Sequence, residues 1–468
     1  MKAEKHIHIL GICGTAMAAI ANLAKEKGYV VSGSDAGIYP PMSDYLASLA
    51  IPVQPFSEAN LDPAPDLCVI GNAMSRGNVE VESILNRGLP YCSGPEFVGN
   101  HILPERHAVV VAGTHGKTST SSIMAHLLES AGLNPGFLIG GIPENFGGGA
   151  RLGGGEHFVL EGDEYDTAFF DKRSKFLHYH ARTLILNNLE YDHADIFPDL
   201  ESIKLQFTHL LRTVPADGNI IVNADDDNLA DVLERGCWSQ ITTFAQRGHP
   251  SADWQWQADS SDGTAFTIYR NGEIYLQCQW SMLGIHNVAN ACAVTAAASR
   301  LGVEAGHIQG AFETFTGIRR RMTLCGTAGG IRVFDDFAHH PTAIQGVVSA
   351  AKAAMKSEGK LWVVIEPRSN TMRTRIHQDR LPNCFDNADQ VIFVPASERN
   401  LQADEVLDVE AVCRAVGPHA LVLPDTASII EHLAIHATDG DDVLILSNGG
   451  FDGIHQKLLK RLETPVTA

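Results

Sequence analysis

Short apolar runs alternate with helix-like segments along the chain. Near the N-terminus, the runs HIHILGI at 6–12 and YVVSGSD at 29–35 flank an Ala-rich segment at 16–28. Aliphatic and β-branched runs of this length favour strands, whereas the Ala-rich segment favours a helix. The pattern predicts a βαβ unit, which the apolar run at 66–74 extends.

Two further blocks repeat this alternation. The second starts with the β-branched run at 108–112, continues with the amphipathic segment 121–130 and closes with an Ala-rich helix predicted at 286–302. Its other strands are predicted at 157–163, 182–188 and 218–226. The stretch from about Trp238 to Trp280 is rich in Thr, Trp and Tyr, and it predicts added antiparallel strands.

The third block starts at residue 331 and places predicted strands at 360–367, 390–395, 419–424 and 442–450 between helical stretches. Strands that alternate with helices predict parallel, doubly wound sheets. The polar segment 100–107 contains proline and predicts a linker after the first block. We therefore expect an α/β protein of three domains, at 1–106, 107–328 and 329–468.

The composition narrows the functional classes. The chain has 468 residues, 44% hydrophobic and 19% charged, which fits globular domains with real cores. Its net charge of −20 argues against nucleic acid or an anionic membrane as a partner. The nine cysteines form no C-x-x-C pair, which favours a reducing compartment. With no signal-like segment and no long apolar run, we expect a cytoplasmic location.

The segment VVVAGTHGKTST at 109–120 resembles a phosphate-binding loop in which a glycine is displaced. The usual pattern, G-x-x-x-x-G-K-[ST], would require glycine at Val111, but the chain has Gly113 instead. A loop that leads from a strand into a helix N-terminus presents free N–H groups to phosphate. Lys117 would reach a β/γ-phosphate and Thr118 would bind Mg²⁺. The alternative is a glycine turn beside an exposed lysine.

Acidic residues follow two other predicted strands. Glu161 ends the run at 157–163, and Asn188, Asp192 and His193 follow the run at 182–188. Parallel sheets present ligand-binding residues at the carboxyl ends of their strands. Mg²⁺ bound to phosphates takes one or two protein oxygens, so these segments predict a metal site. The alternative for each residue is a solvated loop charge.

Two motifs further along the chain fit a nucleotide. His286, Asn287 and Asn290 open the helix predicted at 286–302, where an Asn side chain either contacts an adenine edge or caps the helix. The arginines at 319–321 suit phosphate, although three neighbours cannot all face one ligand, so at least one is expected to be surface charge.

The N-terminal GICGTAM matches the dinucleotide fingerprint G-x-G-x-x-G weakly, because Cys13 and Ala16 stand where glycines are needed. Asp35 ends the second strand, where an acid can hold a ribose hydroxyl. The segment therefore predicts a nucleotide-diphosphate site and not NAD. The alternative is a structural glycine turn.

Taken in order, GICGTAM, SGSD, AGTHGKTST, EGDEYD, NNLEYDHAD, HNVANA, TGIRRRM, DDFAHHPT and EPRSNTMRT resemble the Mur ligase family over essentially the whole chain. That family comprises ATP-dependent, amide-bond-forming enzymes of peptidoglycan metabolism, and its shortened loop has glycine at the position of Gly113. The HNxxN and DDxxHHPT forms are similar to the branch that acts on UDP-N-acetylmuramate. GNAMSRGN, FFDKRSKFLHY, EPRSNTM and SNGGFDGIH resemble its member that adds L-alanyl-γ-D-glutamyl-meso-diaminopimelate during peptidoglycan recycling.

The resemblance implies an N-terminal Rossmann-like domain that binds UDP-sugar, a central P-loop ATPase domain and a C-terminal Rossmann-like domain for the amine substrate. It implies ATP and two Mg²⁺ ions, with Lys117 and His193 as catalytic residues and Thr118, Glu161 and His193 as metal ligands. The implied ATP-binding residues are Gly113, Thr114, His115, Gly116, Lys117, Thr118, Ser119, His286, Asn287, Asn290, Arg321 and Asp336. The implied UDP-sugar residues are Gly11, Ile12, Cys13, Gly14, Thr15 and Asp35.

The peptide site is a hypothesis from the loop at 366–374 and from Asn448. We expect Arg368, Thr371, Arg373 and Asn448 to bind the tripeptide, because guanidinium groups bind carboxylates bidentately. The alternative is that these arginines pair with the excess acids of the chain. Addition of L-alanine, a P-loop kinase or NTPase, and a non-enzymatic sugar-nucleotide sensor are the competing functions. A monomer or homodimer is expected.

Overall fold

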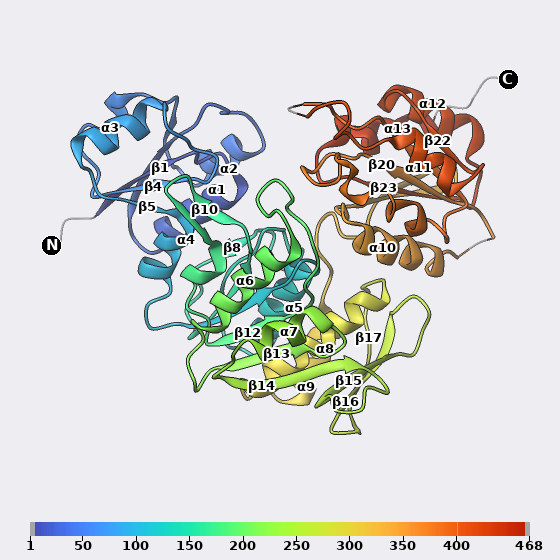
Figure 1. The fold of residues 1–468 in the computed structure, drawn as a ribbon, viewed down its shortest axis with the longest axis horizontal. Coiled ribbons are helices and arrows are strands. Elements are labelled where there is room, and N and C mark those ends of the chain that lie inside the picture. Colours follow the sequence, from blue (N-terminus) through green and yellow to red (C-terminus); the bar gives the residue numbers. More distant parts are fainter. Residues whose placement is uncertain (1–4, 357, 400, 464–468) are drawn as a thin grey trace.

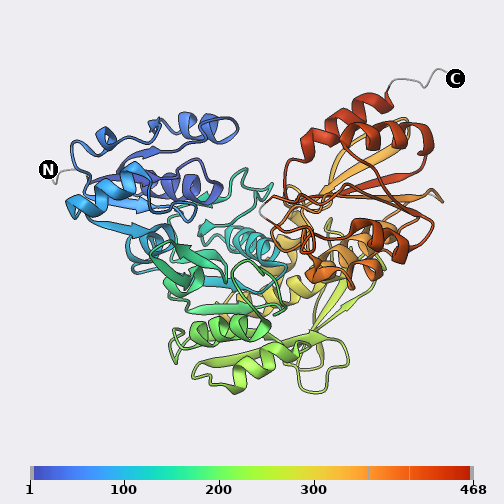
Figure 2. The same cartoon turned by 45° about the horizontal axis from the view of Figure 1, so that its top comes forward.

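The computed structural model describes residues 5–356, 358–399 and 401–463. Three α/β units follow one another along the chain, each with its own sheet (Figure 1). The N-terminal unit and the C-terminal unit lie on either side of the central unit in both views (Figures 1 and 2). The predicted α/β class is confirmed.

The N-terminal unit is a parallel sheet of order β3-β2-β1-β4-β5. Its strands are β1 (His6–Leu10), β2 (Val30–Ser34), β3 (Val53–Gln54), β4 (Leu67–Ile70) and β5 (Tyr91–Ser93). Its helices are α1 (Thr15–Glu26), α2 (Met42–Ser48), α3 (Val79–Arg87), α4 (Gly94–Phe97), the 3₁₀ turn η1 (Glu58–Leu61) and the π-helix η2 (Val98–Ile102). The βαβ prediction holds, but the predicted linker partly lies in η2, where Ile102 is fully buried.

The central unit is built on a ten-stranded sheet of order β17-β16-β15-β14-β13-β12-β6-β9-β7-β8. The strands are β6 (His107–Ala112), β7 (Gly136–Leu138), β8 (Ala150–Arg151), β9 (His157–Gly162), β12 (Thr183–Leu186), β13 (Asn219–Asn223), β14 (Gln240–Gln246), β15 (Trp254–Ala258), β16 (Ala265–Arg270) and β17 (Glu273–Gln279). The hairpin β10 (Asp166–Ala168) and β11 (Asp171–Ser174) stands apart from this sheet. The helices are α5 (Lys117–Ser130), η3 (Lys175–His178), α6 (Leu200–Leu211), α7 (Asp227–Glu234), α8 (Ile285–Arg300) and α9 (Ala305–Thr314).

One prediction about this sheet is partly wrong. The strands β15, β16 and β17 pair antiparallel as expected, but β14 pairs parallel with both β13 and β15. The connection at 247–253 is short, but it can join these two parallel strands because β14 pairs with β15 only from Phe244 to Gln246, at its carboxyl end.

The third unit has the strand order β18-β19-β23-β20-β21-β22. Its strands are β18 (Thr323–Ala328), β19 (Ile331–Asp336), β20 (Leu361–Ile365), β21 (Gln390–Phe393), β22 (Ala420–Val422) and β23 (Asp442–Leu446). Its helices are α10 (Pro341–Ala353), η4 (Arg375–His377), η5 (Leu381–Cys384), α11 (Val409–Val416), α12 (Thr426–His436), η6 (Phe451–Gly453) and α13 (Ile454–Leu462). The sheet is parallel except for the antiparallel edge strand β18. No strand was predicted at β18, which begins before the boundary predicted at 328.

The carboxyl ends of three neighbouring central strands face the third unit. The loops after β6, β9 and β12 begin at Gly113, Asp163 and Asn187, and these strands lie side by side. Helix α10 of the third unit packs against α8 of the central unit (Figures 1 and 2). Within the described ranges, no helix has the length and apolar character needed to span a membrane.

Candidate active site

The loop after β6 has the local structure that phosphate binding requires. Gly113 and Gly116 both adopt positive φ, at 142° and 76°, and α5 starts at Lys117 without a side-chain cap. At Gly116 a side chain would be excluded, because an added Cβ would lie 2.9 Å from Oδ1 of Asn290. The first N–H groups of α5 therefore remain available to a ligand.

Lys117 is buried among carboxylates. Its Nζ donates to Oε2 of Glu164 and to the carbonyl of Gly113, both at 2.8 Å, and lies 4.0 Å from Oδ1 of Asp163. Burial alone would lower the pKa of Lys117, but Glu164 and Asp163 outweigh it and raise that pKa above its usual value. The lysine is therefore a fixed cation at the base of the loop.

The predicted metal ligands fall into two neighbouring groups. The Thr118 hydroxyl donates to Oε1 of Glu161 at 2.8 Å, and Oε2 of Glu161 accepts from the Gly140 amide at 2.7 Å. His193 lies apart from this pair, with its Nε2 3.4 Å from Oε1 of Glu164. Two converging hard oxygens suit Mg²⁺, so the donor set at Thr118 and Glu161 fits that ion.

Glu164 links His193 to Lys117, and the sequence reasoning missed it. Its side chain is 2% exposed, and its two oxygens contact Lys117 and His193. Burial raises the pKa of Glu164, but Lys117 and His193 outweigh burial and lower it. The sequence signal for Glu164 was the run of acidic residues in EGDEYD, of which only Glu161 was predicted to bind the metal.

A cavity of about 210 Å³ opens beside the loop, between the central and third units. Its lining contains many of the predicted nucleotide residues: His115, Gly116, Ser119, His286, Asn287, Asn290, Arg321 and Asp336. The other four, Gly113, Thr114, Lys117 and Thr118, belong to the same loop and the start of α5. Segments as far apart in the sequence as His115 and Asp336 thus meet around one cavity.

The three adjacent arginines have three different environments. Arg319 pairs with the exposed Glu144 at 3.1 Å, whereas Arg320 donates to Asp335 at 3.0 Å. Arg321 alone of the three lines the cavity, where its Nη2 lies 3.5 Å from Oγ1 of Thr118. The expectation that at least one of them carries surface charge is met by Arg319.

The predicted UDP-sugar residues form a turn between β1 and α1. The Cys13 amide donates to Oδ2 of Asp35 at 2.9 Å, and the Gly37 amide donates to Oδ1 of the same side chain at 2.8 Å. Gly11 has a φ of 74°, and Gly14 immediately precedes α1. Asp35 therefore orders the turn, and Ile12 and Thr15 complete it on either side of Cys13 and Gly14.

The predicted peptide residues lie at the ends of β20 and β23, which are adjacent parallel strands. Thr371 is buried, and its hydroxyl accepts from the Ala194 amide at 3.3 Å, which places this loop beside His193. Arg368 pairs with Glu366 at 3.2 Å, whereas Arg373 donates to the carbonyl of Arg399.

Asn448 follows β23, and its buried Oδ1 has no hydrogen-bond partner in the described part of the chain. Of the two arginines, Arg368 meets an acid, as the alternative interpretation expected, and Arg373 is held by a carbonyl.

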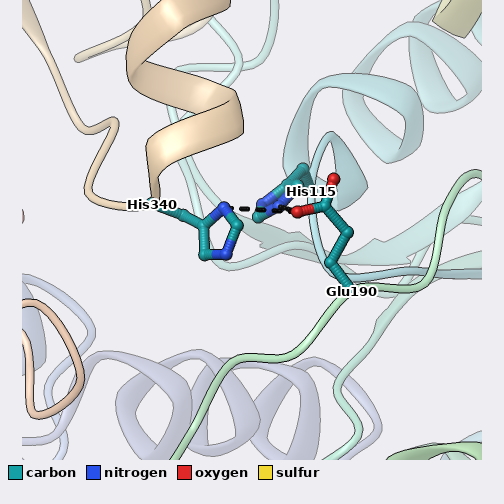
Figure 3. Close-up of side chains that lie close together, drawn as sticks. All are labelled: His115, Glu190 and His340. Atoms are coloured by element: carbon teal, nitrogen blue, oxygen red, sulfur yellow. Dashed lines mark ion pairs between the residues drawn. The ribbon is translucent and has the colours of Figure 1, made fainter. Parts of the chain in front are cut away.

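A cluster that the sequence reasoning did not identify spans the central and third units. His115 of the loop, Glu190 after β12 and His340 before α10 point toward one another (Figure 3). Oε2 of Glu190 lies 3.8 Å from Nε2 of His115 and 3.7 Å from Nδ1 of His340. Burial lowers the pKa of His340 to about 3. The sequence signal was the HHP of DDFAHHPT, to which the family resemblance assigned no role.

Three protein-family models cover most of the chain. The model described as "Mur ligase family, catalytic domain" matches 6–106, "Mur ligase middle domain" matches 111–298, and "Mur ligase, glutamate ligase domain" matches 320–449. The UDP-N-acetylmuramate–L-alanyl-γ-D-glutamyl-meso-2,6-diaminoheptandioate ligase of Escherichia coli (strain K12) is 45% identical over 457 residues, 97% of this chain and 98% of that protein. The chain belongs to the Mur ligase family.

Solved Mur ligase structures share its architecture. The crystal structure of a murein peptide ligase from Psychrobacter arcticus 273-4 has 43% identity and a TM-score of 0.75, covering 99% of this chain and all of that one. The UDP-N-acetylmuramate–L-alanine ligase of Acetivibrio thermocellus is less similar, at 32% identity over 97% of this chain and 96% of that protein.

These comparisons confirm the predicted family, its three-domain α/β fold and the similarity to the tripeptide-adding member, murein peptide ligase. Mur ligases are ATP-dependent enzymes that form amide bonds and use Mg²⁺, and this chain is one of them.

Proposed function

We propose that this enzyme joins UDP-N-acetylmuramate to L-alanyl-γ-D-glutamyl-meso-diaminopimelate, with ATP consumed to ADP and phosphate, in peptidoglycan recycling. The observation that carries the proposal is the 45% identity to the E. coli ligase of that name over nearly the full length of both chains. The similarity to an L-alanine ligase is 32% over a comparable length, which favours the tripeptide as the amine substrate.

The chemistry requires activation of a carboxylate, because its oxygen is a poor leaving group. The lactyl carboxylate attacks the γ-phosphorus of ATP, so that ADP leaves and an acyl phosphate forms. The amine of the peptide then attacks the acyl carbon, loses a proton and expels phosphate, which leaves the amide. Phosphoryl transfer depends mainly on alignment and charge neutralisation.

The residues of the loop would supply that neutralisation. We assign Lys117 to the β- and γ-phosphates, because it is a fixed, buried cation, with the uncapped amides at the start of α5, up to Ser119, as further donors. Arg321, in the connection before β18, would add a second cation, since it reaches Thr118 across the cavity. Asn287 and Asn290, with His286, would contact the adenine, and Asp336 would contact the ribose side of the nucleotide.

Two Mg²⁺ ions are part of the proposal. Thr118 and Glu161 would hold one ion, and His193 would hold the second next to Glu164. Bound there, Mg²⁺ would neutralise phosphate charge during transfer. We assign Lys117 and His193 as catalytic residues on this basis.

The remaining assignments concern the other substrates. The turn at Gly11, Ile12, Cys13, Gly14 and Thr15, ordered by Asp35, would hold the UDP group. Arg368, Thr371, Arg373 and Asn448 would hold the peptide. The loop of Arg368 contacts the segment after His193, which would bring the amine toward the phosphate loop.

The cytoplasmic location, the monomeric or homodimeric state and the domain boundaries at 1–106, 107–328 and 329–468 complete the proposal.

The test is whether ATP consumption depends on both other substrates. The purified enzyme is incubated with Mg²⁺ and ATP, with and without UDP-N-acetylmuramate and the tripeptide, and products are read by mass spectrometry. We expect ADP and an amide-linked UDP-muramoyl tripeptide only when all three substrates are present. A phosphorylated acceptor as the final product, or equal ATP hydrolysis without the amine, would show a kinase or an NTPase instead.

A further inference from the structure

We propose that His115, Glu190 and His340 form a binding site for a divalent transition cation, with Zn²⁺ as the best fit, which links the central and third units. The three ligand atoms, one from each side chain, all lie within 4.8 Å of one another (Figure 3). This site is separate from the proposed Mg²⁺ ligands Thr118, Glu161 and His193, and it has a different chemistry.

The spacing of the ligand atoms is close to what Zn²⁺ requires. Ligands about 2.0–2.1 Å from a tetrahedral zinc lie roughly 3.3 Å from one another. Glu190 Oε2 is 3.8 Å from the His115 nitrogen and 3.7 Å from the His340 nitrogen. The ligand atoms lie at most 4.8 Å apart, so side-chain adjustments of up to about 1.5 Å bring both histidines and Glu190 to coordination distance of the same cation, with a fourth position left for water or substrate.

Both histidines present a nitrogen to this point. Nε2 of His340 is 3.3 Å from the carbonyl of Tyr191, which can only accept, so the proton lies on Nε2 and Nδ1 carries the lone pair. A backbone carbonyl on the far nitrogen is the usual way in which proteins orient a metal-binding histidine. Nε2 of His115 is buried, and within the described ranges it has no hydrogen-bond partner.

The Glu190 carboxylate is also held in orientation, and Arg380 competes with a cation for it. The Thr342 hydroxyl donates to both oxygens of Glu190, at 3.0 and 2.8 Å, which turns the carboxylate toward the histidines. Nη2 of Arg380 lies 3.3 Å from Oε2 of Glu190, and the Thr342 amide donates weakly to Nδ1 of His340 at 3.3 Å. A bound cation would displace these two contacts.

Two imidazoles and one carboxylate select the class of cation. Imidazole nitrogen suits zinc and its neighbours in the transition series, whereas Mg²⁺ prefers oxygen ligands and keeps its waters. The site would therefore bind Zn²⁺ in the presence of a large excess of Mg²⁺.

The location of the site gives it a consequence for turnover. His115 belongs to the phosphate loop and Glu190 to the central unit, whereas His340 precedes α10 of the third unit. A cation held by all three fixes the two units in this arrangement. Because substrate entry and product release require domains to move, bound Zn²⁺ is expected to inhibit the enzyme.

The test measures Zn²⁺ binding to the full-length protein without nucleotide, by calorimetry in millimolar Mg²⁺, and repeats the titration with Co²⁺ for its visible spectrum. We expect one high-affinity Zn²⁺ ion and an intense Co²⁺ absorption of the kind that tetrahedral coordination gives. In His340→Asn, the asparagine can still cap α10, but the affinity falls at least tenfold. The matched control is His436→Asn, which breaks the neighbouring His432 and His436 pair on α12 and leaves this affinity unchanged.

A gain-of-affinity variant excludes misfolding as the cause. Arg380 is about half exposed and competes for Glu190, so Arg380→Met should tighten Zn²⁺ binding by a factor of roughly two to five, the typical strength of an exposed ion pair. Wild-type affinity in His340→Asn, or weaker binding in Arg380→Met, would overturn the proposal. So would a Co²⁺ spectrum without the intense band. None of these readings depends on the ligase reaction.

Discussion

Replacement of Lys117 by methionine separates its structural role from its role toward phosphate. Methionine keeps most of the length of the side chain but removes the cation that lies 2.8 Å from Glu164. Glu164 is 2% exposed and, among the residues that the structure describes, would keep only His193, at 3.4 Å, as a partner of opposite charge. Breaking a buried pair in this way costs about 3–5 kcal/mol, because one charge is left buried without compensation.

The second substitution tests that explanation. In Lys117→Met with Glu164→Gln, the uncompensated charge of Glu164 is removed as well, so most of the lost unfolding free energy should return. The ligase activity should not return, because the phosphates still lack their cation, and loss of one such donor costs roughly 10²–10³ in kcat. The double variant is therefore expected to regain stability but not ligase activity.

The pH dependence has a defined sign. In the wild type the pKa of Glu164 is lowered, so its contribution to stability is present above its ordinary value of 4.5 and is lost as the pH falls. Without Lys117, burial dominates and raises that pKa. The loss of unfolding free energy in Lys117→Met, relative to the wild type, should then be small near pH 4 and grow as the pH rises.

Urea unfolding followed by tryptophan fluorescence is the assay, since Trp254, Trp256 and Trp280 are buried in the central unit. Lys172→Met is the matched control, because Lys172 is 70% exposed beside Asp166 and its loss should cost below about 1 kcal/mol. A free energy of unfolding of Lys117→Met within about 1 kcal/mol of the wild type would refute this explanation. So would a double variant with Glu164→Gln that is no more stable than Lys117→Met alone.

Three other predictions concern the metal ligands, Arg321 and the buried Glu80. Glu161→Gln and His193→Ala should each raise the Mg²⁺ concentration needed for half-maximal activity, and unchanged titrations in both would show that the metal site is misplaced. Arg321→Met should raise the KM for ATP about tenfold, whereas Arg319→Met, whose guanidinium pairs with an exposed acid, should leave it unchanged; equal effects would remove Arg321 from the nucleotide site. Glu80 is fully buried; burial raises its pKa, but its hydrogen bonds outweigh burial and lower the pKa overall. The free energy of unfolding should therefore fall as the pH drops below 4.5, and Glu80→Gln should reduce this loss of stability in acid unfolding.

Much of the fold follows from local patterns. The strands β1, β6, β9, β12 and β20 coincide with the apolar runs, because strands buried on both faces are apolar at most positions. The edge strand β18 escaped prediction, because its sequence TLCGTA is only half-buried and carries no continuous apolar signal. The parallel pairing of β14 also escaped prediction, since strand direction depends on how the chain connects neighbouring strands in space and not on composition.

The site was predictable where a motif fixes the backbone, and less so where contacts are long-range. The loop at 113–118 was found because glycines and a lysine at fixed spacing dictate a local shape. Glu164 was missed because nothing near it in the sequence shows that it meets both Lys117 and His193. The different environments of Arg319, Arg320 and Arg321 likewise depend on how the third unit packs.

The most direct test of the central claim compares the two candidate amines in one assay. The enzyme is given ATP, Mg²⁺ and UDP-N-acetylmuramate with either the tripeptide or L-alanine at equal concentration, and kcat/KM is measured for each. The account predicts a strong preference for the tripeptide, which should shrink in Arg368→Met and Arg373→Met as the peptide carboxylates lose their partners. A kcat/KM for L-alanine equal to or above that for the tripeptide would contradict the recycling function.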